Sequence, residues 1–193
     1  MKANFLRRPH GPADYLADAV RLLGALSVLG AAVWFQPTDA GVVAFTLPAL
    51  VAPRFLGMRA APDIALQLVV LVAAWSNVFD LYRTIGVWDI LVHFACTGVL
   101  TLAGYLFLAR SGAVAAPRSR GATVLGTLVV AVILGLALSA LWEMVEWAGW
   151  RFISGEIHVS YQDTIGDMAA GGTGALVAGI VLAGARLTRP DAT

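Results

Sequence analysis

Three pairs of ionisable side chains have the spacing expected of a shared binding site. They are Asp89 and His93, Glu143 and Glu146, and Asp163 and Asp167. Residues three or four positions apart lie on one face of an α-helix, so each pair presents its two groups together. Carboxylates suit hard divalent ions such as Mg²⁺, Ca²⁺ or Mn²⁺, and an imidazole favours Zn²⁺, Fe²⁺ or Mn²⁺. The pairs therefore predict a divalent metal site formed by these six residues.

All three pairs lie at the ends of strongly apolar segments, where charge is costly. An ionisable side chain near the membrane centre costs about 2.5–3.5 kcal/mol, so it is usually paired or bound to a ligand. A bound cation, shared protons or an aqueous vestibule would each relieve the repulsion among these carboxylates. A di-iron centre fits less well, because it normally uses two Glu-x-x-His motifs and the chain contains none.

Structural explanations also exist for several of these residues. Asp163 could cap the start of a helix, and Asp89 could pair with Arg83. His93 could be a buried hydrogen-bonding residue. A helix dipole disfavours acids at a carboxyl end, so Glu143 and Glu146 carry the strongest functional signal. Two further candidates, Glu156 and His158, are expected in a loop, where a functional role is the weaker interpretation.

The composition is that of an all-α integral membrane protein, whose helices must position these groups. Of its 193 residues, 59% are hydrophobic and 13% are charged, and the mean hydropathy is +0.79. An ordinary soluble domain has roughly 25% charged residues. No basic block points to nucleic acid. The one cysteine, Cys96, excludes an internal disulfide and a thiolate cluster.

Apolar runs predict six membrane-spanning helices in a single transmembrane domain. The expected spans are 16–35, 40–53, 64–79, 88–109, 121–150 and 164–187. Residues 1–15 form an amino-terminal segment, followed by an uncleaved first helix, and residues 188–193 form a tail. The run at 40–53 is short for a crossing and contains Pro48, so it is the weakest of the six.

Basic residues give the predicted orientation, because cytoplasmic loops are enriched in Lys and Arg. With six crossings, eleven of the thirteen basic residues fall on the side of the two termini, and Arg83 and Arg151 fall opposite. Both termini are therefore expected to be cytoplasmic. The opposite face collects most of the acids: Asp39, Asp80, Asp89, Glu143, Glu146, Glu156, Asp163 and Asp167. The metal site is thus expected at the outer membrane face.

The last span carries a stripe of small residues at four-residue spacing: Gly171, Ala175, Gly179 and Ala183. Such a stripe lets helices approach closely. It could serve packing within the protein or a homo-oligomer, and internal packing is the favoured interpretation with six spans to bundle.

The order of the motifs resembles a known family. Asp-x-x-x-His-Phe at 89–94, Glu-x-x-Glu-Trp at 143–147 and Asp-Thr-x-x-Asp-Met at 163–168 precede a Gly/Ala-rich helix. This pattern resembles the YjdF-like family of bacterial inner-membrane proteins and, more distantly, VanZ-type proteins associated with teicoplanin resistance. The resemblance covers roughly Asp80–Ala183. It implies a multi-pass protein of the bacterial inner membrane and names no substrate.

Three functions fit the sequence. The first is a metal-dependent enzyme or binding protein that acts on a lipid or envelope precursor, with Glu143 or Glu146 as the general base for a water on the ion. The second is an ion- or proton-coupled transporter, and the third is a structural or partner-binding protein. A transporter needs polar residues towards the cytoplasmic side, and the last three spans offer few: Thr97, Thr101, Thr123, Thr127, Ser139 and Thr173. That scarcity favours a one-sided site.

Overall fold

The computed structural model describes residues 1–155, 157, 159–190 and 192, and these residues form helices without a β-strand. In chain order the helices are α1 (Lys2–Leu6), α2 (Pro12–Trp34), α3 (Pro37–Ala44), α4 (Leu47–Phe55), α5 (Ala60–Val78), α6 (Leu81–Thr84), α7 (Trp88–Arg110), α8 (Val124–Phe152) and α9 (Tyr161–Gly184). Five of them are long and apolar enough to cross a membrane: α2, α5, α7, α8 and α9. The prediction of an all-α membrane protein is confirmed.

The described chain divides into two compact units. Met1–Gly86 and Arg186–Thr193 form the first unit, and Val87–Ala185 forms the second. In the first unit, helices α2, α3 and α5 pack around a small apolar core of Ala31, Val43 and Ala74. The three pairs of candidate site residues all belong to the second unit.

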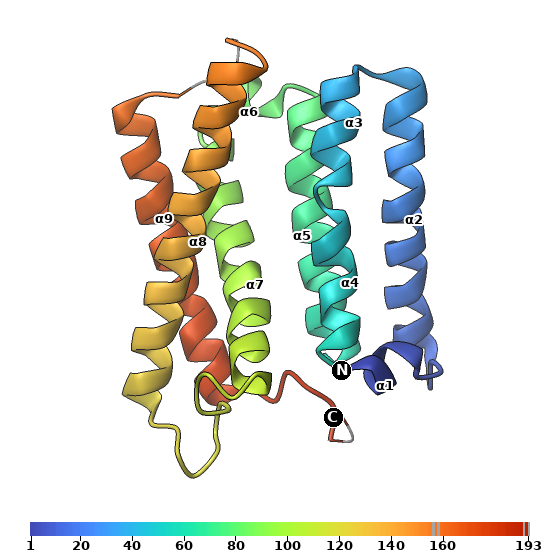
Figure 1. Ribbon diagram of the computed structural model, residues 1–193, viewed down its shortest axis with the longest axis vertical. Coiled ribbons are helices and arrows are strands. Elements are labelled where there is room, and N and C mark those ends of the chain that lie inside the picture. Colours follow the sequence, from blue (N-terminus) through green and yellow to red (C-terminus); the bar gives the residue numbers. More distant parts are fainter. Residues whose placement is uncertain (156, 158, 191, 193) are drawn as a thin grey trace. The chain divides into compact units, whose positions relative to one another are not determined.

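The predicted span at 40–53 is formed by two short helices. Helices α3 and α4 follow one another along one line (Figure 1) and are divided at Phe45 and Thr46. The Thr46 hydroxyl donates to the carbonyl oxygen of Val43 at 2.7 Å, and Pro48, the second residue of α4, has no N–H to donate. A count of six crossings requires α3 and α4 to act as one broken span.

An ion-pair network closes one end of the first unit. Arg21 donates to both carboxylate oxygens of Asp63, at 2.8 and 2.9 Å, and to Asp18 at 2.5 Å. Arg54 donates to both oxygens of Asp18, at 2.7 and 2.8 Å. The acids at this end therefore have arginine partners.

The carboxyl-terminal segment belongs to the same unit. Arg189 pairs with Asp14 and also donates to the carbonyl oxygen of Met58. The Arg59 N–H donates to the carbonyl oxygen of Leu187 at 2.8 Å. The last helix was predicted to reach Leu187 and ends at Gly184, because the residues after it turn away to make these contacts.

Small residues let the three helices of the second unit pack closely. A Cβ on Gly174 of α9 would lie 2.0 Å from the carbonyl oxygen of Phe94 on α7, and a Cβ on Gly135 of α8 would lie 2.1 Å from the Ala175 side chain. A Cβ on Gly179 would lie 3.1 Å from Ala131. The small-residue stripe of α9 therefore packs inside this unit, as predicted.

Candidate metal site

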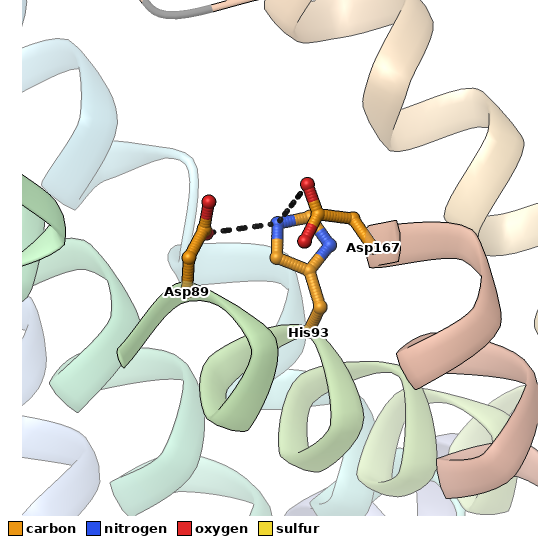
Figure 2. Close-up of side chains that lie close together, drawn as sticks. All are labelled: Asp89, His93 and Asp167. Carbon is orange, nitrogen blue, oxygen red and sulfur yellow. Dashed lines mark ion pairs between the residues drawn. The ribbon is translucent and has the colours of Figure 1, made fainter. Parts of the chain in front are cut away.

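His93 and Asp89 face each other near the start of α7. Their spacing of one helical turn places His93 Nε2 3.3 Å from Asp89 Oδ1. Figure 2 shows both side chains rising from the same helix, with Asp167 approaching from α9. Asp167 Oδ2 lies 4.0 Å from the same ring nitrogen. The Nε2 edge of His93 therefore faces two carboxylates.

The other ring nitrogen faces α8. His93 Nδ1 lies 3.8 Å from Glu143 Oε1, and Glu146 lies one turn further along the same helix. The cluster is thus built from the first turns of α7 and α9 and the last turns of α8, all at one end of the three-helix unit.

Two overlapping groups in this cluster have ligand atoms close enough to share an ion. Asp89, His93 and Asp167 form one group, and His93, Glu143 and Glu146 form the other, with the ligand atoms of each within 4.8 Å of one another. A neutral imidazole has one nitrogen that accepts and one N–H that donates. A neutral His93 can therefore ligate an ion in one group and donate a hydrogen bond in the other.

The cluster is withdrawn from solvent. The exposed fractions are 6% for His93, 2% for Asp167 and 9% for Glu143. Within the part of the chain that the structure describes, Glu143 Oε1 is buried and has no hydrogen-bond partner. A buried oxygen of this kind costs about 1–3 kcal/mol, and more when it is charged. The described residues therefore leave Glu143 Oε1 without a hydrogen bond, and that oxygen lies 3.8 Å from His93 Nδ1.

Five of the six predicted ligands come together, and Asp163 does not join either group among the described residues. Ser160 caps α9, with its Oγ accepting from the backbone N–H of Asp163 at 3.2 Å. Asp163 therefore lies in the first turn but is not the capping residue. Arg83 is the other partner considered for Asp89, and its Nε lies 3.6 Å from Asp80 Oδ1. Glu156 and His158 fall outside the described residues.

Thr97 and Ser139 also lie near the site, although the sequence pattern alone did not assign them to it. Thr97 follows His93 by four residues on α7, and Ser139 precedes Glu143 by four residues on α8. Both are buried, with 6% and 1% exposed. The same spacing rule that paired the charged residues would have placed both hydroxyls on the site-facing sides of their helices.

Comparison with known families gives a match over most of the chain. The family described as "Predicted membrane protein (DUF2238)" matches residues 16–188. The chain belongs to this family. It is the kind of family that the YjdF-like motifs indicated, and the match extends over the first spans, which the motif resemblance did not cover. The distant resemblance to VanZ-type proteins is not shown by the comparisons. No curated protein and no solved structure matches the chain.

Proposed function

We propose that this member of the DUF2238 family binds one divalent cation in the second unit and acts on a lipid or envelope-related substrate at the outer face of the bacterial inner membrane. In this proposal, six crossings count α3 and α4 as one span, the chain is a single transmembrane domain, and both termini are cytoplasmic.

One observation supports the bound cation most directly. Glu143 Oε1 is buried without a hydrogen-bond partner among the described residues and lies 3.8 Å from His93 Nδ1. Two atoms that each bind an ion at about 2.1 Å lie about 3–4 Å apart, so this separation suits two ligands of one ion.

We assign the ion to the side of the cluster formed by His93 Nδ1, Glu143 and Glu146. Asp89 lies within hydrogen-bond distance of Nε2, at 3.3 Å, so Asp89 is suited to accept the Nε2–H and leave Nδ1 for the ion. Carboxylate partners of this kind commonly orient histidine ligands. Asp167, 4.0 Å from Nε2, adds negative charge that favours the cation.

A hard ion such as Mg²⁺ or Mn²⁺ fits the oxygen-rich ligands, and the imidazole also permits Zn²⁺. Whichever of Glu143 and Glu146 is not needed to hold the ion is available as a general base for a water molecule on it.

The close packing below the cluster favours a one-sided site over a transport pathway. A Cβ on Gly98 of α7 would lie 3.2 Å from the carbonyl oxygen of Gly174 on α9, and a Cβ on Gly135 of α8 would lie 3.4 Å from the Cα atom of Ala175 on α9. Backbone contacts of this kind leave little room for an ion to pass between the helices.

Metal analysis of the purified protein tests the proposal. We expect about one divalent ion per chain, lost in Glu143→Gln and retained in the matched control Asp163→Asn, which changes an acid outside both groups. Absence of metal from the wild type, together with no effect of added Mn²⁺ on thermal stability, would refute cation binding.

A further inference from the structure

A second layer of residues lies one helical turn below the cation cluster. Thr97 follows His93 on α7, Ser139 precedes Glu143 on α8, and Gly171 follows Asp167 on α9, each at a spacing of four. A Cβ on Gly171 would lie 2.7 Å from Ser139 Oγ and 2.8 Å from Thr97 Oγ1. Two hydroxyls from two helices therefore converge on the bare backbone of the third, within reach of one bridging water.

The Ser139 hydroxyl does not make the bond that is usual for its position. Serine and threonine within helices often donate to the carbonyl one turn back. Ser76 donates to Val72 and Thr127 donates to Thr123 in this way. Ser139 Oγ, in a residue 1% exposed, has no hydrogen-bond partner within the described part of the chain.

Two buried oxygens on successive turns of one face of α8 therefore have no hydrogen-bond partner among the described residues. They are Ser139 Oγ and Glu143 Oε1. Each carries a desolvation cost that a bound ligand would remove. A hydroxyl can donate and accept, so it suits a water molecule as well as a cation.

We propose that Ser139 and Thr97 form a floor that holds one water molecule, and that this water is a ligand of the cation. The inference rests on the proposed cation site. An ion-to-water bond of about 2.1 Å and a water-to-hydroxyl bond of about 2.8 Å together cover about 4.9 Å of the ~6 Å that four helical residues rise. The floor is thus at the right depth for a water between it and the ion. Mg²⁺ and similar ions usually keep several waters.

The test is Mn²⁺ affinity of the full-length protein in detergent, measured for the wild type, Ser139→Ala and Thr97→Val. We expect each variant to bind Mn²⁺ about tenfold more weakly, as for other residues that support metal ligands indirectly. Thr127→Val is the matched control, because that buried hydroxyl bonds within its own helix, and its affinity should equal that of the wild type.

Thermal unfolding of the cation-free protein separates this role from a purely structural one. Ser139→Ala removes a hydroxyl without a partner, so the cation-free variant should be at least as stable as the wild type. If both Ser139→Ala and Thr97→Val bind Mn²⁺ with wild-type affinity, the water-binding role of these hydroxyls is refuted and the cation site is not. Weak binding accompanied by a lower unfolding temperature without cation also refutes that role. Absence of Mn²⁺ binding by the wild type overturns both proposals.

Discussion

His93 Nδ1 and Glu143 Oε1 lie 3.8 Å apart, which is beyond a hydrogen bond and within the range of two ligands on one ion. They come from α7 and α8, and neither residue is more than 9% exposed. Three of the four clustered carboxylates, those of Asp89, Glu143 and Asp167, lie within 4.0 Å of a ring nitrogen of this one imidazole. The cluster therefore carries more negative charge than His93 can balance.

Replacement of Asp89 should show which ring nitrogen of His93 binds the ion. If Asp89 orients His93 through Nε2, Asp89→Asn should weaken Mn²⁺ binding about tenfold, because the ring loses its charged partner but keeps its ligand nitrogen. His93→Gln should remove binding almost completely. Titration with Mn²⁺ measures both. Equal loss in the two variants would show that Asp89 is itself a ligand and that the ion lies on the Nε2 side.

Gly174 should be sensitive to a single added methyl group. In Gly174→Ala the new Cβ would meet the Phe94 carbonyl oxygen at 2.0 Å, so α7 and α9 must separate, at a cost of about 1–3 kcal/mol. Gly166→Ala on the same helix is the control, because its Cβ would meet Ile90 at an ordinary 3.6 Å. That variant should gain up to about 1 kcal/mol from helix propensity. The thermal unfolding temperature should therefore be lowest for Gly174→Ala, intermediate for the wild type and highest for Gly166→Ala. Equal unfolding temperatures would contradict the packing described.

The arginine network should stabilise the first unit. Arg21→Met leaves Asp63, whose side chain is 8% exposed, without its bidentate partner. Breaking a buried pair in this way costs about 3–5 kcal/mol. Arg8→Met changes an exposed arginine of the same unit and should alter stability by no more than about 0.5 kcal/mol. If unfolding temperatures of the two variants agree, the network contributes no net stability.

A reporter fused after Pro117 tests the orientation. The loop between α7 and α8 carries Arg118 and Arg120, so we expect a cytoplasmic signal. With a cytoplasmic amino terminus, as proposed, the same result requires an even number of crossings before that loop, so α3 and α4 must then count as one span. A periplasmic signal would place the metal cluster at the cytoplasmic face and remove the argument for an outer-leaflet substrate.

The spacing of charged residues predicted most of the cluster, because helices α7, α8 and α9 are long and regular. Asp89 with His93, and Glu143 with Glu146, needed only the helical repeat. Asp163 was included on the same grounds, but Ser160 sets the start of α9, and Asp163 lies a turn nearer that end than Asp167.

Other features depend on contacts that spacing along the chain does not reveal. The break between α3 and α4 involves local bonding at Thr46. Arg21 and Asp63 are 42 residues apart, and their pairing follows from the packing of α2 against α5. Arg189 and Asp14 are 175 residues apart, and their pairing follows from the contact of the carboxyl-terminal segment with α2. The convergence of Thr97 and Ser139 on Gly171 likewise required the positions of three helices.

Pulsed electron paramagnetic resonance of the Mn²⁺-loaded protein tests the central claim most directly, because it detects nitrogen bonded to the metal. The proposal predicts one Mn²⁺ per chain with a ¹⁴N coupling from an imidazole, absent in His93→Gln and present in Asp163→Asn. Mn²⁺ bound without a nitrogen coupling, or a coupling that persists in His93→Gln, would contradict a cation site at His93.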